Sequence, residues 1–118
     1  MSFASIQSRA LVGFQALRVR VEVHLANGLP SFTLVGLADT EVKEARERVR
    51  AALAQSGFEF PHNRRITVNL APADLPKESG RFDLPIAVGM VAASEQMEST
   101  LLEKFVMVGE LALTGAVR

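Results

Sequence analysis

The stretch from 66 to 94 constrains the fold of this chain most, because it encodes a strand, a tight loop and a buried helix in succession. Ile66, Val68 and Leu70 alternate with polar residues, which is the period of a strand with one apolar face. No charged residue occurs between Asp83 and Glu95, so apolar side chains cover most of the following helix. We expect that helix to be buried nearly all round. It is too short and too weakly apolar to span a bilayer.

The loop between this strand and this helix holds the most suggestive chemistry. Its prolines and Gly80 exclude regular structure, and its charges precede a helix N-terminus, which is a natural anion site. Asp83 is predicted to be the N-cap, with its carboxylate accepting from the Ile86 N–H. The alternative is that the loop charges are merely solvated and that Asp83 only caps. The charged and hydroxyl residues of the loop are Asp74, Lys77, Glu78, Ser79, Arg81 and Asp83.

Length and charge bound the class of protein. The 118 residues suit a single domain, 1–118, with a real core. The 13 basic and 13 acidic side chains cancel, so any basic surface must be local.

There is no cysteine, which excludes disulfides and thiolate chemistry and fits the cytoplasm. The N-terminus lacks the pattern of a signal peptide. Because residues 114–118 resemble a hairpin turn running into a new strand, we expect the chain to be a fragment of a longer protein.

The remaining elements can be placed along the chain. Residues 3–12 predict a strand or strand pair interrupted near Ser8 and Arg9, and 17–25 alternates cleanly as a strand. With Asn27-Gly28 as the turn, 17–37 is predicted to be an antiparallel hairpin. Residues 95–104 predict a short helix and 105–113 a strand. That last strand is predicted to pair in parallel with 66–70 through a right-handed helical crossover.

The first long helix is predicted to begin at Asp39 or Thr40 and to end before Gly57. Its apolar stripe repeats at helical spacing, and Glu44 and Arg48 are placed to pair on the outside. The stripe consists of Val42, Ala45, Val49, Ala52 and Leu53. Together these elements predict an α+β fold, a two-layer mixed sheet with helices on one face.

Several kinds of site can be weighed from the residues. The chain has no Gly-Lys pair and therefore no phosphate loop, so we expect no nucleotide hydrolysis by it. His24 and His62 lie on different elements without a cysteine, so no metal site is predicted. Ser79 is a weak candidate nucleophile, because Lys77 is badly placed as its base and Lys104 reaches it only through the fold.

Nucleic acid is the other possible ligand. Local basic groups occur on the first long helix, in the turn at 62–65 and in the loop before the second helix. Phe58 and Phe60 lie near the basic turn but make a poor stacking platform by sequence alone. Arg18 and Arg20 offer an alternative basic face. In a chain with no net charge, ordinary solvated surfaces are the more common explanation of all these groups. The candidates are Arg64, Arg65, Lys43, Arg46, Arg50, Lys77 and Arg81.

Longer strings of residues resemble a known family. They are Asn27-Gly28-Leu29-Pro30-Ser31-Phe32, Val35-Gly36-Leu37-Ala38-Asp39, the run from Val42 to Ala52, Ser56-Gly57-Phe58, the run from Ile66 to Leu75, and Phe82-Asp83-Leu84-Pro85-Ile86-Ala87. They closely resemble the N-terminal domain of the magnesium-chelatase-like AAA+ ATPases of the ComM or YifB type. The resemblance covers nearly the whole chain.

This resemblance implies a fold like that of the Lon protease domain and of a small-subunit ribosomal protein. It also implies an AAA+ module outside this chain that holds ATP and magnesium, and no cofactor within the chain. The expected partners are that module, neighbouring subunits of a hexamer and DNA, and no membrane. The family is implicated in natural transformation, as a motor for branch migration of DNA.

The comparison with Lon bears on catalysis. Pro76-Lys77-Glu78 followed by Gly80 is similar to the run ahead of Lon's catalytic serine, but the serine position falls near Phe82 or Asp83. The resemblance therefore implies the scaffold without the peptidase chemistry. We expect a non-catalytic domain that assists ring assembly or DNA engagement. The alternatives are a Lon-like peptidase using Ser79, and a protein-interaction module using the polar face of 18–24 or the outer face of 41–50.

Overall fold

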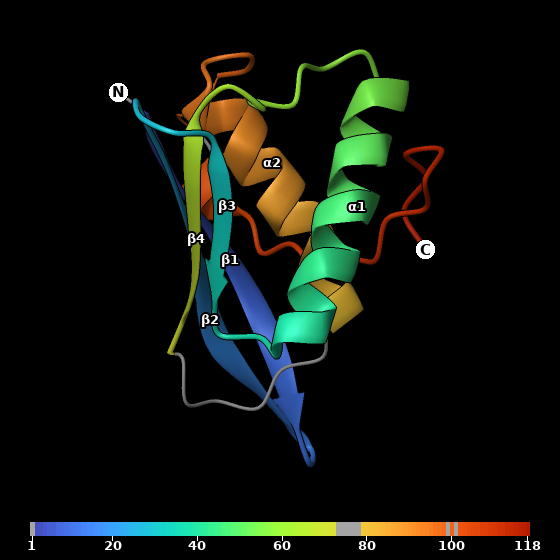
Figure 1. Ribbon diagram of the computed structural model, residues 1–118. Helices are drawn as coiled ribbons and strands as arrows, with labels where there is room; N and C mark the ends of the chain where they lie inside the picture. The colour runs from blue at the N-terminus through green and yellow to red at the C-terminus, as the bar shows by residue number, and fades with distance from the viewer. Residues whose placement is uncertain (1, 73–78, 99, 101) are drawn as a thin grey trace.

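A four-stranded sheet and two α-helices form two layers in the computed structural model, which describes residues 2–72, 79–98, 100 and 102–118. Both helices lie on one face of the sheet (Figure 1). This confirms the predicted two-layer α+β class. In the described part of the chain, no helix is both long and apolar enough to cross a membrane. The elements are β1 (Phe3–Val12), β2 (Gln15–Ala26), β3 (Ser31–Val35), α1 (Asp39–Gln55), β4 (Arg65–Ala71), the 3-10 turn η1 (Ser79–Phe82), α2 (Asp83–Ala93) and the 3-10 turn η2 (Leu102–Lys104).

The strand order is β1-β2-β4-β3. β2 pairs antiparallel with both β1 and β4, whereas β3 pairs with β4 in parallel. Every second side chain is buried along β1 from Ala4, in β2 from Val19 to Leu25 and in β4 from Ile66 to Leu70, which is the alternation read from the sequence. The predicted strands at 17–25 and 66–70 are therefore confirmed.

The predicted hairpin over 17–37 is wrong. β3 does follow β2, but β4 lies between them and takes the hydrogen bonds of both. A hairpin signal such as Asn27-Gly28 is local, and it cannot report that a later strand inserts between the two arms. The parallel pair in this sheet is β3 and β4, joined through α1, because parallel strands need a long crossover connection.

The predicted strand at 105–113, parallel to 66–70, is also wrong. This segment makes only isolated bridges, between Gln7 and Val106 and between Leu111 and Val117. Its backbone is used elsewhere, because the Gly109 N–H donates to the Arg81 carbonyl and the Gly109 carbonyl accepts from the Leu84 N–H. β-propensity alone did not reveal these contacts with the start of α2.

Two smaller expectations also change. β1 is one continuous strand through Ser8, although an interruption was predicted there. The polar side chain of Ser8 can be buried within the strand because its hydroxyl donates to the Met107 carbonyl at 2.6 Å. The short helix predicted in 95–104 reduces to η2. At the end of α1, Gly57 has a φ of 84°, which confirms it as the left-handed residue after the helix.

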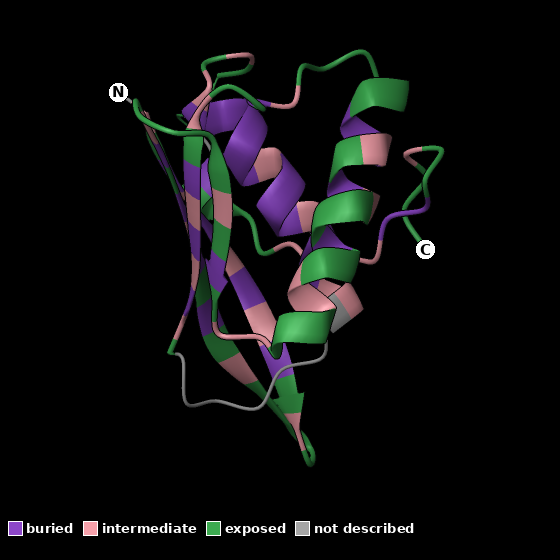
Figure 2. Ribbon diagram, in the orientation of Figure 1, coloured by how far each residue is buried: buried purple, intermediate pink, exposed green. Residues whose placement is uncertain are grey.

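α2 lies at the centre of the core. Nine of its eleven residues are buried, whereas α1 buries only the stripe around Ala45 and Val49 (Figure 2). The predictions of a helix buried nearly all round and of an amphipathic first helix are both confirmed. Gly89 lets α2 approach β2 closely, because a Cβ at this position would lie 2.7 Å from Cγ2 of Val23.

We predict that Gly89→Val destabilises the fold by about 1–3 kcal/mol, the usual cost of overpacking a dense core. Urea unfolding followed by circular dichroism measures it. Ala54→Val, at an exposed site of α1, should cost only a few tenths of a kcal/mol through helix propensity. Equal effects at the two sites would contradict the close helix–sheet approach.

Candidate functional site

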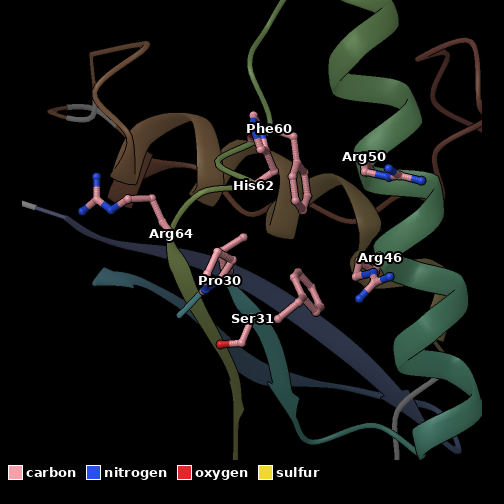
Figure 3. Close-up of a pocket in the computed structure, with 9 residues that line it drawn as sticks. Pro30, Ser31, Arg46, Arg50, Phe60, His62 and Arg64 are labelled. Atoms are coloured by element: carbon pink, nitrogen blue, oxygen red, sulfur yellow. The ribbon is translucent and has the colours of Figure 1, made fainter. Parts of the chain in front are cut away.

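A pocket of about 220 Å³ opens between the start of β3, the exposed side of α1 and the connection that leads into β4. Figure 3 shows Phe60 and His62 on one side, Arg46 and Arg50 on α1, and Pro30 and Ser31 across from them. The structure therefore gathers residues from three separate parts of the sequence. The lining residues are Pro30, Ser31, Phe32, Arg46, Arg50, Phe60, His62, Arg64 and Ile66.

Two of the predicted basic residues, Arg46 and Arg50, are neighbours on α1 because they lie four residues apart. Glu47 contacts both, with its carboxylate 2.9 Å from Nη2 of Arg50 and 3.8 Å from Nε of Arg46. These side chains are about half exposed, so the ion pairs are weak and solvent-screened. Both guanidinium groups can therefore exchange this partner for an anion.

Aromatic side chains form the apolar part of the pocket. Phe32 and Phe60 are only partly buried, and both pack against the hydrophobic core. His62 is exposed and its Nδ1 lies 3.1 Å from the Phe60 carbonyl oxygen, which holds the ring beside this wall. The sequence analysis did not predict Phe32 as a site residue, because Phe32 and Phe60 lie 28 positions apart in the chain. The one available signal was that Phe32 belongs to the Asn27–Phe32 run, one of those that carry the family resemblance.

Arg64 lines the pocket in a different way. Its Nη2 donates to Oγ of Ser2 at 3.0 Å and lies 3.5 Å from the Leu25 carbonyl oxygen. Its guanidinium points away from the other labelled residues in Figure 3. The charged end of Arg64 thus ties the connection to the N-terminus and to β2, whereas the rest of the residue borders the pocket.

The other predicted basic residues do not gather here. Lys43 is exposed on α1 outside the pocket, and Arg65 is exposed at the start of β4, on the sheet face away from the helices. Arg81 lies in η1 beside Glu110 and Arg118. Lys77 lies outside the described residues. The predicted set is therefore divided among at least three surfaces.

The remaining site candidates can be located briefly. The backbone of Ser79 begins η1, while residues 73–78, including the Pro76-Lys77-Glu78 run, lie outside the described residues. His24 is exposed on β2, whereas His62 lies in the connection before β4, so the two histidines belong to different elements. Among the residues that the structure describes, no cluster of three histidine or acidic side chains is placed to hold a metal.

Asp83 is not the N-cap that the sequence predicted. It is the first residue of α2, with Phe82 in the cap position, and its side chain makes no capping bond. Its carboxylate instead accepts two hydrogen bonds from Arg48, at 2.6 Å from Nε and 3.1 Å from Nη2, and one from the Leu111 N–H at 3.1 Å. The predicted partner of Arg48, Glu44, is displaced by this pairing. A buried acceptor bonded to a cation outcompetes an exposed partner one helical turn away.

The electrostatics of this pair follow from its burial. The Asp83 side chain is 0% exposed and that of Arg48 is 21% exposed, so the desolvation cost falls mainly on the carboxylate. Burial raises the pKa of Asp83, although the bonds from Arg48 and Leu111 lower it part of the way back. The hydrogen bond to Asp83 raises the pKa of Arg48, which favours the charged pair. The bonds from Arg48 and Leu111 thus offset part of the cost of burying the Asp83 carboxylate, while either half of the pair alone is costly.

A second, apolar groove of about 280 Å³ lies between α1, α2 and the C-terminal turn. Leu84, Val88 and Leu111 line it, as does Phe58, which is 39% exposed. Val117 closes one side and is also largely exposed. This groove shares no residue with the basic and aromatic pocket.

Comparison with known proteins places the chain in a family. Residues 21–118 match the family model described as "Subunit ChlI of Mg-chelatase". The chain belongs to the Mg-chelatase ChlI family. The predicted resemblance to chelatase-like proteins is therefore confirmed.

Individual relatives agree with this assignment. Over all 118 residues, this ChlI-family chain is 60% identical to the competence protein ComM of Haemophilus influenzae. It is 59% identical to YifB of Salmonella typhimurium and 56% identical to YifB of Escherichia coli. In each case it spans the N-terminal 23% of the relative's length.

We predict that Arg48→Met in this ChlI-family chain lowers the free energy of unfolding at pH 7 by about 3–5 kcal/mol, because it leaves the Asp83 carboxylate buried without its ion partner. Adding Asp83→Asn to Arg48→Met should recover part of the lost free energy of unfolding, because it removes the buried charge. Urea unfolding followed by circular dichroism measures both. A double variant no more stable than Arg48→Met would contradict this reading.

The cost of Arg48→Met should also depend on pH. Without Arg48, the bond from the Leu111 N–H is left to oppose the burial that raises the pKa of Asp83 above its unfolded value near 3.9. The native state then binds the proton more tightly, so stability is highest below that value and falls as pH rises through the raised pKa. We expect a smaller loss at pH 4.5 than at pH 7.5, and no such difference in the double variant. Equal losses at both pH values would refute the argument.

Proposed function

We propose that this chain is a non-catalytic N-terminal domain of a ComM-like AAA+ ATPase that processes DNA, and that it helps the motor engage DNA. ATP and magnesium belong to the ATPase module of the longer protein, which we propose to be a cytoplasmic hexamer acting in branch migration during natural transformation. The name of the Haemophilus influenzae relative, competence protein ComM, supports this proposal. The family match supports the ATPase context.

The observation that carries DNA engagement is the gathering of Arg46 and Arg50 with Phe60 and His62 at one pocket. Cations that position phosphates and aromatic groups that meet bases are the two components of nucleic-acid surfaces. The chain has no net charge, so this local cluster, rather than a global field, has to attract a polyanion.

Burial at the Lon-like serine position supports the non-catalytic part of the proposal. Phe82 and Asp83 occupy that position, and both are 0% exposed. Asp83 is moreover committed to Arg48 and to the Leu111 N–H. A nucleophile has to be accessible to substrate and activated by a base, and these two residues satisfy neither condition.

A protein-interaction module is the second candidate, because the apolar groove beside α2 is an exposed apolar surface of the kind that partners cover. If this second candidate is correct, the domain contributes to assembly of the longer protein with its partners and not to DNA binding. The two candidates use different faces and can be separated by mutation.

We predict that the domain binds fluorescein-labelled single-stranded or branched DNA at low salt and that affinity falls steeply as salt rises. Fluorescence anisotropy over a salt titration measures this. The double change Arg46→Gln with Arg50→Gln should reduce the slope of log affinity against log salt by about 1–2, one or less per lost phosphate contact.

The matched control is Arg18→Gln with Arg20→Gln, which removes the same charge from the opposite face of the sheet. It should leave the slope nearly unchanged. Absence of binding at low salt would refute DNA engagement and favour the assembly candidate.

A further inference from the structure

We propose that the pocket in Figure 3 holds one unstacked base of single-stranded DNA, with neighbouring phosphates of the same strand on Arg46 and Arg50. This inference rests on the proposed function, because it names the form of DNA that the domain engages. It adds a preference for single strands over duplex and assigns a role to each wall of the pocket.

The size of the pocket suits one flat group. Its volume of about 220 Å³ is below the roughly 300–1,000 Å³ of sites that enclose a drug-sized ligand. A single base fits such a space, whereas its sugar and phosphate remain outside at the rim. The base has to be free of its complement to enter, because flipping a base out of a duplex costs free energy.

The aromatic wall provides the surface for that base. Phe60 and Phe32 come from the connection and from β3, and both are anchored in the core, so little side-chain freedom is lost when a base stacks on them. Stacking on an aromatic face is tolerant of sequence, because every base has a π-face. We therefore expect little discrimination among bases.

The arginine wall provides the phosphate contacts. Arg46 and Arg50 lie on the exposed side of α1, and their common partner Glu47 holds them only by exposed ion pairs. A phosphate displaces this carboxylate at small cost. Glu47→Gln should therefore raise affinity for single strands several-fold, in contrast to the loss expected from Arg46→Gln.

The sequence offers a direct reporter of stacking. The chain contains no tryptophan and no tyrosine, so Phe60→Trp creates a single fluorophore in the pocket. An oligothymidine strand should quench its fluorescence on binding, and a duplex of the same length should not. Phe58→Trp is the matched control, because Phe58 borders the apolar groove rather than this pocket and should stay unquenched.

Anisotropy with the same strands tests the two walls separately. Phe60→Leu should weaken single-strand binding about 5- to 100-fold with the salt slope unchanged, because it removes stacking and no charge. Arg46→Gln should lower the slope by about 0.7, the value for one phosphate of a single strand. Circular dichroism melts check that each variant is folded, and the quenching of Phe60→Trp is independent of any stability change in Phe60→Leu.

Each contrary outcome is distinct. DNA binding without quenching of Phe60→Trp, or equal quenching by duplex, would overturn the base pocket and leave DNA engagement standing. Loss of all binding at low salt would overturn both proposals. Quenching by thymidine monophosphate as strong as by oligothymidine, at equal base concentration, would overturn strand engagement in favour of a free nucleotide.

Discussion

The arrangement of the helices depends on one buried ion pair, between Asp83 at the start of α2 and Arg48 in the middle of α1. A fully buried carboxylate tolerates few arrangements of its neighbours, because each lost hydrogen bond leaves an expensive charge in the core. The Leu111 N–H completes its set of donors and so draws the C-terminal segment to the same point. The pair thus links three segments that hydrophobic contacts alone position less strictly.

This pair also divides the arginines of α1 by role. Arg48 faces α2 and is held by Asp83, so the helix is fixed about its own axis. Arg46 and Arg50 then lie on the side that borders β3 and the connection into β4. The parallel pairing of β3 with β4 places the other walls of the pocket, because it brings the start of β3 beside the residues preceding β4. The candidate site is therefore a consequence of the crossover and of the ion pair together.

The sequence predicted the local elements well and their pairing poorly. Alternation in 17–25 and 66–70, the apolar run after Asp83 and the stop at Gly57 each express local physics, and all appear as expected. The hairpin over 17–37 and the strand at 105–113 failed because strand pairing depends on residues far away in the chain. Asp83 looked like a cap because caps are local, whereas its actual partner lies 35 positions away. Three of the basic candidates, Arg46, Arg50 and Arg64, do line one pocket, but their aromatic neighbour Phe32 was not visible from composition or spacing.

The proposed contact between nucleic acid and the pocket beside α1 can be tested directly. The most direct measurement is the change in amide chemical shifts of the isotope-labelled domain during titration with oligothymidine. We predict the largest changes at Ser31, Phe32, Arg46, Arg50 and residues 60–62. Changes concentrated on residues 18–24 of the open sheet face, or around the apolar groove beside α2, would contradict it.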